Sequence, residues 1–509
     1  MQNDYQLYWG DFHCHLEDVD HASRYLEEAR RNTDFYPVLC YPFAWDVCRG
    51  LKVESVRSRP EFLGGWQKLR EVVRNFHQPG QFVTFLGYEW HGNRRQYGDH
   101  NVFYFDGNGS LDDAWSLNSL YKNLRKTRAI AIPHHTGYLP GRRGKDWGFH
   151  DDNLSPVTEI FSDHGSSEGT DTPLPLRGNG SMGPRVTGGT WQDGLAQGHR
   201  LGCIASGDGP GLAGRWGKGL AGLWAKDLTR ESLWESLLER RTYAVTGDRI
   251  RLWFAANGYP MGSVIRREKT LEFTADVEGL HAMDRIELIR NGRVIDTYCH
   301  SGKWIHPVGT GRVKVRIESG WGPATYYGFP KGKSIWNMRL QVCGGRLLAS
   351  TPCFSLLGQR MGKIEKDSCA WHFDIPYRTD SGSWKEFCQS VVFEIQGTPA
   401  TILQMWANGR RFSLKLKEVL AGSHLFPLLA ESRKIIFKTF HLSASEIANP
   451  DIYFQNAGKV KVHMAVPEPG YKISVRFKDT AVPRGHNYYY LRVTQTNGQM
   501  AWSSPIWVR

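Results

Sequence analysis

The first half of the chain combines two spacings of apolar residues. Helical spacing marks residues 21–35, residues 67–80 up to a Pro-Gly stop, and residues 229–245 after a threonine cap. Short apolar runs lie between these segments and are expected to form buried parallel strands; they cover residues 35–41, 82–90, 101–105, 129–135, 157–161 and 201–208. Because polar residues follow these runs, the pattern predicts an α/β barrel-like domain with its chemistry at the C-terminal strand ends.

After residues 246–250 the pattern changes to short alternating strands separated by Gly, Asn and Lys turns. This pattern is typical of an antiparallel β-sandwich. We therefore expect a barrel over residues 1–247 and a β-sandwich region over 248–509, in which residues 360–470 form either an insertion or a second sandwich. The two runs joined at Asn497 and Gly498 are expected to pair near residues 249–258.

Composition narrows the class of protein. Hydrophobic residues make up 40% and aromatic residues 13% of the 509 positions, which is enough for buried cores. No apolar run reaches the ~18 residues of a membrane span, and the N-terminus has no signal-peptide pattern. The nine cysteines are dispersed without a CxxC motif, which favours a reducing compartment. We expect a soluble cytoplasmic protein, or a periplasmic one if a signal peptide has been removed.

Charge is unevenly distributed along the chain. Residues 1–250 contain 29 Lys and Arg against 31 Asp and Glu, whereas residues 251–509 contain 35 against 20. The basic half indicates either an anionic partner or a solvated basic face, and both alternatives stay open. The sequence has no helix-turn-helix, zinc-finger or ribonucleoprotein pattern, so a specific nucleic-acid partner is not expected. The oligomeric state does not follow from these patterns.

Candidate chemistry gathers at the ends of the predicted strands. Imidazole and carboxylate groups are the preferred ligands of Zn, Mn and Fe(II). Such residues recur along the first half: Asp11, His13, His15, Glu89, His91, His100, His134, His135, Glu159, His164 and Asp208. In a strand, His-x-His places both rings on one face because side chains alternate. The whole set predicts a metal site, although any single histidine also has a structural interpretation.

The segments GDFHCH, GYEWHG, IPHH and ASGDGPG, in this order and spacing, resemble the PHP (polymerase and histidinol phosphatase) superfamily. Within it, the chain is most similar to a large, poorly characterised bacterial family with a C-terminal sandwich. The resemblance covers about residues 1–300 and the last 25 residues, and leaves residues 300–470 unassigned. It implies a distorted (β/α)7 TIM-like barrel that binds two or three metal ions, followed by an all-β sandwich region.

The resemblance also implies roles for individual residues at the first metal. His13 and His15 would be its ligands, Asp208 would complete the site, and Glu89 would bridge it to a second metal. A carboxylate suits that bridge because its two oxygens can serve two cations. Asp11 would accept a hydrogen bond from a ligand histidine or lie beneath the loop. The metals would be Mn, Zn or Fe.

For the second metal, the resemblance implies His100 and one of His134 and His135 as ligands. His91 and His164 would bind substrate or act as a catalytic acid. Four arginines on loops just beyond ligand positions suit an anionic substrate, although a solvated loop is the simpler interpretation for them; they are Arg94, Arg95, Arg142 and Arg143.

The chain departs from the superfamily at the third metal. His21 matches one third-site ligand, but the two other positions fall on Cys40–Tyr41 and on Pro210. We therefore expect a site for two metals, with His21 and Tyr41 left as substrate contacts, and complete loss of catalysis remains an alternative.

Together these features favour a metal-dependent hydrolase of a phosphoester or another anionic ester, using water activated by two metals. A metal-dependent lyase acting on an acidic (uronate or sulfated) sugar or polysaccharide is the first alternative. Tryptophans of the basic half fit glycan binding but are more often core residues; they include Trp304, Trp321, Trp336 and Trp406. A non-catalytic glycan- or polyanion-binding protein on a decayed PHP scaffold is the second alternative. In each case the partner is an anionic small molecule or a glycan.

Overall fold

The computed structural model describes residues 4–16, 19–40, 59–90, 92–112, 114–176, 182–210, 213–304, 309–325, 328–356, 358–379 and 387–509. The chain divides into two compact units. The first unit contains residues 1–279, 283–299 and 473–509, and the second contains residues 280–282 and 300–472. The predicted boundary between residues 247 and 248 falls inside the first unit and stays a prediction. Within the described residues, no helix is both long and apolar enough to cross a membrane.

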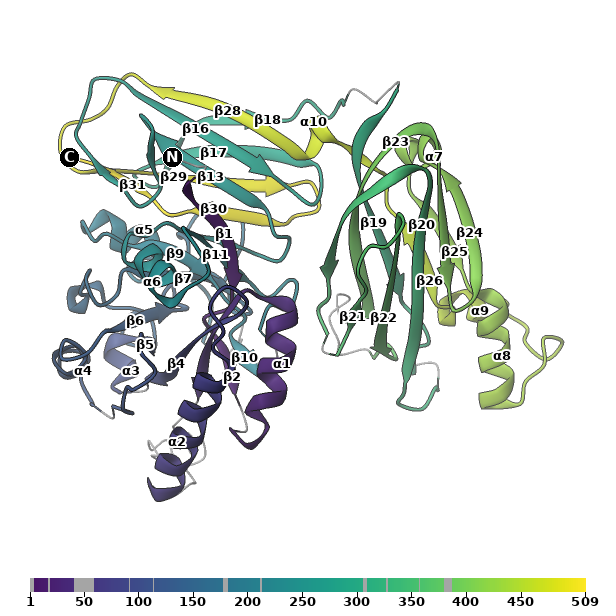
Figure 1. Ribbon diagram of the computed structural model, residues 1–509, viewed down its shortest axis with the longest axis horizontal. Coiled ribbons are helices and arrows are strands. Elements are labelled where there is room, and N and C mark those ends of the chain that lie inside the picture. Colours follow the sequence, from purple (N-terminus) through teal and green to yellow (C-terminus); the bar gives the residue numbers. More distant parts are fainter. Residues whose placement is uncertain are drawn as a thin grey trace. The chain divides into compact units, whose positions relative to one another are not determined.

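The first unit is built on a long mixed sheet with the strand order β15-β31-β29-β30-β12-β11-β1-β3-β4-β5-β6 (Figure 1). The strands of its α/β part are β1 (Gln6–Gly10), β2 (Cys14–Leu16), β3 (Phe35–Cys40), β4 (Val83–Trp90), β5 (Asp99–Tyr104), β6 (Ala129–His134), β7 (Val157–Ser162), β8 (Gly165–Ser166), β9 (Gly202–Ala205), β10 (Gly209–Pro210), β11 (Leu220–Ala225) and β12 (Thr242–Val245). The helices between them are η2 (Val19–His21), α1 (Ala22–Asn32), α2 (Arg59–Phe76), α3 (Arg94–Tyr97), α4 (Leu117–Leu124), η3 (Trp147–Phe149), α5 (Trp191–Ala196) and α6 (Arg230–Leu238).

All three predicted helices are present, but the third ends at Leu238, and residues 242–245 of its predicted range form β12 instead. Helix α1 buries Ala22, Leu26 and Ala29, and α2 begins earlier than expected but ends at Phe76, before the Pro-Gly stop. The hydroxyl of Thr229 caps α6 by accepting from the backbone N–H of Ser232. A short hydroxyl side chain at this position satisfies one of the free N–H groups of the first turn.

Strand direction differs in part from the expectation. β1, β3 and β4 are parallel neighbours, and β7 pairs with β9 in parallel. The prediction of parallel strands at 101–105 and 129–135 is wrong, because β4–β5 and β5–β6 are antiparallel. Only residues 91–98 join β4 to β5, and a parallel crossover needs about a dozen or more. β7, β8 and β9 form a separate sheet in the described part, and barrel closure stays a prediction.

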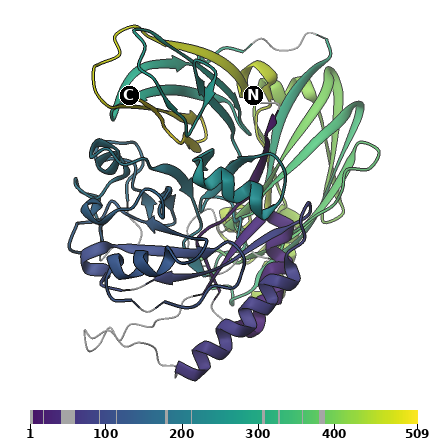
Figure 2. The same ribbon diagram turned by 60° about the vertical axis from the view of Figure 1, so that its left-hand side comes forward.

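Residues 251–299 and the C-terminal strands form a sandwich-like part of the first unit, seen above the α/β strands in Figures 1 and 2, at the end opposite α2. Its strands are β13 (Arg251–Ala256), β14 (Tyr259–Pro260), β15 (Val264–Ile265), β16 (Leu271–Glu278), β17 (Met283–Arg290), β18 (Arg293–Cys299), β28 (Lys472–Asp479), β29 (Asn487–Gln495), β30 (Met500–Ser503) and β31 (Ile506–Val508). The last strands do not pair with residues 249–258 themselves but with strands on either side of them, because β31 pairs with β15. β30 pairs instead with β12 and β29, whereas β13 pairs with β14 and β16.

The second unit contains a nine-stranded sheet with the order β21-β22-β20-β23-β19-β26-β25, to which β24 and β27 also pair. Its strands are β19 (Gly311–Gly320), β20 (Lys333–Cys353), β21 (Arg360–Met361), β22 (Ser368–Pro376), β23 (Cys388–Ala407), β24 (Arg410–Lys415), β25 (His424–Pro427), β26 (Lys459–Val462) and β27 (Val466–Pro467). Its helices are α7 (Leu416–Ala421), α8 (Leu429–Phe440), α9 (Asp451–Asn456) and α10 (Glu468–Tyr471). The unit has a hydrophobic core of its own, which includes Val315, Trp336 and Phe393.

Candidate metal centre

Eight ligand-type side chains of the first unit converge in three overlapping groups. Within each group, one donor atom of every member lies within 4.8 Å of the others. The groups are His13, His134, Glu159 and Asp208; His13, His15 and Glu89; and His135, His164 and Asp208. His13 and Asp208 each belong to two groups, so the three sets form one continuous cluster. β2, β4, β6 and β7 carry four of its members, and the other members lie on the adjoining loops.

His13 lies at the middle of the cluster and is buried. Its Nδ1 is 2.9 Å from Oε2 of Glu159, while its Nε2 is 3.3 Å from Oδ1 of Asp208 and 3.6 Å from Oε2 of Glu89. With an ionised carboxylate, Nδ1–H is the donor of the first contact. Glu159 then orients the ring, and the Nε2 lone pair points towards the other two carboxylates, as in carboxylate–histidine–metal sites.

Glu89 presents its two oxygens to different histidines. Oε2 lies 2.7 Å from Nε2 of His15, and Oε1 lies 3.7 Å from Nε2 of His134. The His134 ring stands edge-on to the His13 ring at 4.1 Å between centroids. A carboxylate between two sets of imidazoles has the arrangement that a bridging ligand needs.

The third group extends the cluster through His164. Its Nε2 is 3.2 Å from Oδ2 of Asp208, and its Nδ1 is 2.7 Å from the hydroxyl of Tyr138. The His135 ring lies 4.8 Å away. His135 and Asp208 both adopt positive φ angles, 34° and 49°, which is uncommon for residues other than glycine. Strained backbone of this kind concentrates at functional sites.

The charges of the cluster favour a cation. Although burial alone lowers the pKa of His13, Asp208 and Glu159 raise it well above its usual value. Burial raises the pKa of Glu159. Among the described residues, His13 Nε2, both ring nitrogens of His134, His135 Nδ1 and Glu159 Oε1 have no hydrogen-bond partner. Buried polar atoms without partners are costly, and divalent cations would satisfy the lone pairs among them, one for each neutral imidazole, so the residues present fit a metal centre.

A second network of charges borders the cluster. Asp99 is buried and accepts from Arg94 at 2.5 and 2.6 Å and from Arg143 Nε at 2.9 Å. Burial alone would raise the pKa of Asp99, but the two guanidiniums hold it well below its usual range. Oδ2 of Asp99 also lies 3.4 Å from Nε2 of His135. Two of the four predicted arginines are therefore engaged beside the cluster.

His100, by contrast, belongs to none of the groups found among the described residues. In the register of β4 and β5, Glu89 pairs with Asn101 and Trp90 pairs with His100. Because side chains alternate along a strand, His100 faces away from Glu89. Its ring contacts Trp90, and its Nε2 lies 3.3 Å from Nζ of Lys145. Asp99, two positions before Asn101, is the residue of β5 that reaches the cluster.

The other predicted residues lie in diverse places. Asp11 is buried and accepts from the backbone N–H groups of His13, Gly207 and Gly214, so it supports the loops. Of the remaining residues, three belong to none of the cluster's groups and two lie outside the described residues. His21 is exposed at the N-terminus of α1, Arg95 and Arg142 are exposed, and His91 and Tyr41 lie outside the described residues.

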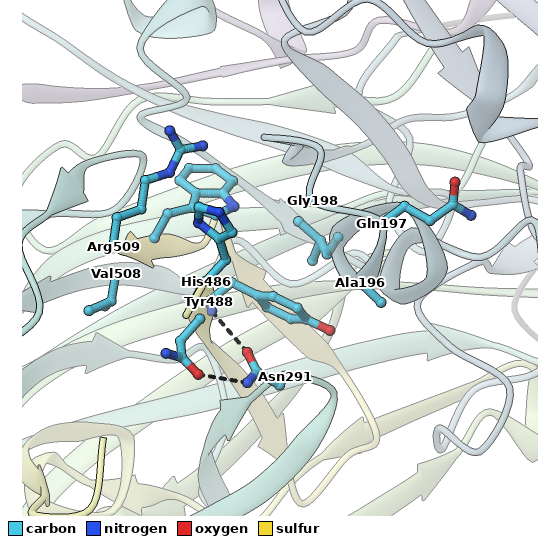
Figure 3. Close-up of a pocket in the computed structure, with 11 residues that line it drawn as sticks. Ala196, Gln197, Gly198, Asn291, His486, Tyr488, Val508 and Arg509 are labelled. Carbon is cyan, nitrogen blue, oxygen red and sulfur yellow. Dashed lines mark hydrogen bonds between the residues drawn. The ribbon is translucent and has the colours of Figure 1, made fainter. Parts of the chain in front are cut away.

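A cavity of about 500 Å³ lies elsewhere in the first unit (Figure 3). Gln197 and Gly198 contribute to its lining, and His486, Tyr488 and Arg509 face it from the C-terminal segment. None of the eight cluster residues lines this cavity. The cavity and the candidate metal centre are therefore separate features.

Comparison with known proteins gives matches to parts of the chain. Residues 213–276 match a family described as a protein of unknown function (DUF3604). An uncharacterized protein of Chlamydia pneumoniae is 29% identical over 262 residues, which are 46% of this chain and 40% of the relative. One of Chlamydia trachomatis is 25% identical over 328 residues, 58% of this chain and 49% of the relative. The matches thus span less than half the length of these relatives.

Among solved structures, the chain is similar to a two-domain protein from Bacteroides vulgatus described as containing a predicted PHP-like metal-dependent phosphoesterase. The identity is 11%, the alignment covers 81% of this chain and 96% of the other, and the TM-score is 0.32. A TM-score this low does not define a shared fold.

Proposed function

We propose that the chain is a metal-dependent hydrolase of a phosphoester or another anionic ester, with its active site at the cluster around His13. The observation that carries the proposal is the overlap of the donor groups, which share His13 and Asp208 and place Glu89 between His15 and His134. Such an arrangement offers adjacent positions for two cations, with His13, His15, Glu89, His134 and Asp208 as the ligands. The resemblance of the four sequence segments to the PHP superfamily supports the same activity.

Divalent cations held there would supply Lewis acidity and make water more acidic. The chain's own residues provide the rest of the chemistry. Glu159 fixes the His13 ring through the Nδ1 contact. His164, held between Tyr138 and Asp208, is positioned to pass a proton to a leaving group. Arg143, half-buried near His135, places a positive charge where an anionic ester would bind.

Release of inorganic phosphate tests the proposal. Chelator-treated protein is supplied with Mn²⁺ or Zn²⁺ and assayed on a panel of phosphomonoesters and phosphodiesters. We expect metal-dependent turnover in the wild type and a loss of at least about 100-fold in Asp208→Asn. The exposed Asp284→Asn is the matched control and should retain activity. Turnover that is equal in Asp208→Asn and wild type, or that persists without metal, would contradict the proposal.

The contacts of two tryptophans of the basic half argue against the lyase alternative. Trp336 is buried in the core of the second unit, and the guanidiniums of Arg339 and Arg411 lie over the ring of Trp406. These two tryptophans therefore do not present an open face for stacking on a sugar ring. Incubation with uronate polymers separates the two activities, because a lyase generates an unsaturated product that absorbs ultraviolet light and a phosphoesterase does not.

A further inference from the structure

A second group of potential metal ligands lies in the first unit and shares no residue with the cluster around His13. His150, Asp152 and His199 place one donor atom each within 4.8 Å of one another. Oδ1 of Asp152 is 3.4 Å from Nε2 of His150 and 3.3 Å from Nδ1 of His199. A tetrahedral zinc site with bonds of about 2.0–2.1 Å has ligand–ligand separations of roughly 3.3–3.4 Å. The observed separations match these values.

The hydrogen bonds around this group leave its metal-binding atoms available to a cation. His199 Nε2 lies 3.0 Å from the carbonyl oxygen of Trp147. A carbonyl only accepts, so Nε2 carries the proton and Nδ1 of the neutral ring presents a lone pair to Asp152. Two acceptors then face each other at 3.3 Å, which is unfavourable without a cation or a proton between them. The carbonyl also fixes the ring, as outer partners of metal-bound histidines do.

His150 provides an independent observation. Its side chain is 0% exposed, and neither ring nitrogen has a hydrogen-bond partner among the described residues. A buried, unpartnered imidazole aimed at a carboxylate is expected of a metal ligand.

The surroundings of Asp152 are compatible with this use. Oδ1 accepts the backbone N–H of Arg200 at 3.2 Å, and the Arg200 guanidinium lies 3.9 Å from Oδ2. Because a carboxylate oxygen has two lone pairs, Oδ1 keeps one for a cation. Arg240 donates to the backbone carbonyl of Asp152 at 2.8 Å and so holds the loop in place.

The position of this group in the fold indicates that a bound ion would serve stability rather than chemistry. His150 and Asp152 precede β7, which begins at Val157, and His199 precedes β9, which begins at Gly202. These two parallel strands also carry Glu159 and lead to Asp208, but the second group lies at their N-terminal ends. In (β/α) barrels, the fold expected from the sequence, that end of the strands serves stability and the C-terminal end serves chemistry.

We propose that His150, Asp152 and His199 bind one divalent ion of the zinc class, and that this ion stabilises the first unit by joining the segments that precede β7 and β9. The ion has no part in the hydrolysis proposed above. Its binding is therefore measured without an activity assay, and the two proposals can fail separately.

The test uses the full chain with His13→Ala and Asp208→Asn, because these two changes remove a member from every group of the first cluster. Metal-free protein is titrated with Co²⁺ alone. We expect one ion per chain, with the visible absorption of tetrahedral Co²⁺, and no binding after the further change His199→Ala. His77→Ala, at a histidine outside all the groups, is the matched control and should bind as before. Absence of bound Co²⁺ in the starting variant, or binding that survives His199→Ala, would overturn the proposal.

A second variant tests the site even if His199→Ala fails to fold. Asp152→Asn keeps the size of the side chain and its acceptor for Arg200 but loses the charged oxygen. We expect it to weaken Co²⁺ binding at least about tenfold in the same background. Zn²⁺ at about 100 times its dissociation constant should raise the midpoint of thermal unfolding by roughly 5 °C in the starting variant and not in Asp152→Asn. Equal affinities and equal shifts would count against the site.

Discussion

The buried carboxylates of the first unit differ in the groups that compensate their negative charge. Glu89, Glu159 and Asp208 are almost fully enclosed and lie around imidazoles rather than around lysines or arginines. Asp99, in the charge network that borders the cluster, is instead neutralised by Arg94 and Arg143. The first set is therefore suited to binding cations, whereas the charge of Asp99 is already compensated within the chain.

Asp99→Asn tests the second set. The change leaves two guanidiniums beside an amide, and breaking a buried ion pair costs about 3–5 kcal/mol. We expect a lower free energy of unfolding by this amount in denaturant titrations, together with weaker substrate binding, because Arg143 and His135 lose the group that orients them. Asp284→Asn, at an exposed aspartate, is the control and should change the free energy of unfolding by less than about 0.5 kcal/mol. A fully stable Asp99→Asn protein would contradict the role assigned to this network.

Lys145 gives a pH-dependent prediction. Burial lowers its pKa from 10.5 to about 7. The unfolded chain therefore binds more protons than the folded chain between about pH 7 and pH 10.5, so the lysine penalises stability fully below that window and not at all above it. Lys145→Met should stabilise the fold by a few kcal/mol at pH 6 and lose this advantage near pH 10.5.

Thermal unfolding of Lys145→Met and wild type at the two pH values measures the difference. Lys122→Met, at an exposed position of α4, is the control and should show no such pH dependence. A stability difference that is the same at both pH values would show that Lys145 is not held with a depressed pKa.

Several of these residues could be predicted from the sequence and others could not. His-x-His and the carboxylates at strand ends identify His13, His15, Glu89 and Asp208 as a set, and the structure brings them together. Glu159 was visible as a ligand-type residue, but its contact with Nδ1 of His13 depends on the placement of β7. Asp152 and His199 are 47 positions apart in the sequence, and no local pattern links them.

At the scale of elements, alternation along β5 decides which side chains reach the cluster. Asp99 and Asn101 share the face of Glu89, whereas His100 points to the face of Trp90. The sequence indicates a strand here, but the choice between the two faces follows from the register with β4. That register depends on the antiparallel pairing, which the pattern of short apolar runs did not predict.

A pair of variants tests this face assignment. His134→Gln removes a ring that lies 3.7 Å from Glu89 and should weaken metal binding at least about tenfold. His100→Gln should leave the affinity unchanged, since its ring lies on the opposite face. Isothermal titration of metal-free protein with Mn²⁺ or Zn²⁺ measures both. Weaker binding in His100→Gln than in His134→Gln would restore His100 as the ligand expected from the sequence resemblance.

At the scale of the whole molecule, the chain forms two units with separate hydrophobic cores. The first unit is discontinuous, because residues 473–509 return to it after the second unit is complete. Local patterns predicted strands throughout the second half and either an insertion or a second sandwich at residues 360–470. The expected pairing of the last runs near residues 249–258 anticipated the return, but not its partners, because β29 and β30 pair with strands 200 or more positions earlier.

Separate cores predict separate unfolding transitions. Leu223 belongs to a core of the first unit and Phe393 to the core of the second, and both are 0% exposed. We expect two calorimetric transitions, one for each unit. Leu223→Ala should lower the free energy of unfolding of the first unit and Phe393→Ala that of the second, each by about 2–5 kcal/mol. Added Zn²⁺ should raise only the transition that Leu223→Ala affects, because the four donor groups found in the described residues all lie in the first unit. A single transition shifted by both variants would contradict two independent units.

We propose that the cluster around His13 is a centre for two metals, and anomalous X-ray diffraction from crystals soaked in Mn²⁺ would locate both ions. We expect two anomalous peaks within bonding distance of the cluster. One should lie among His13, His15 and Asp208 and the other beside His134, with Glu89 between them. Both should vanish in His13→Ala/Asp208→Asn crystals. Wild-type crystals that bind Mn²⁺ elsewhere, with no peak near His13 or Asp208, would contradict it.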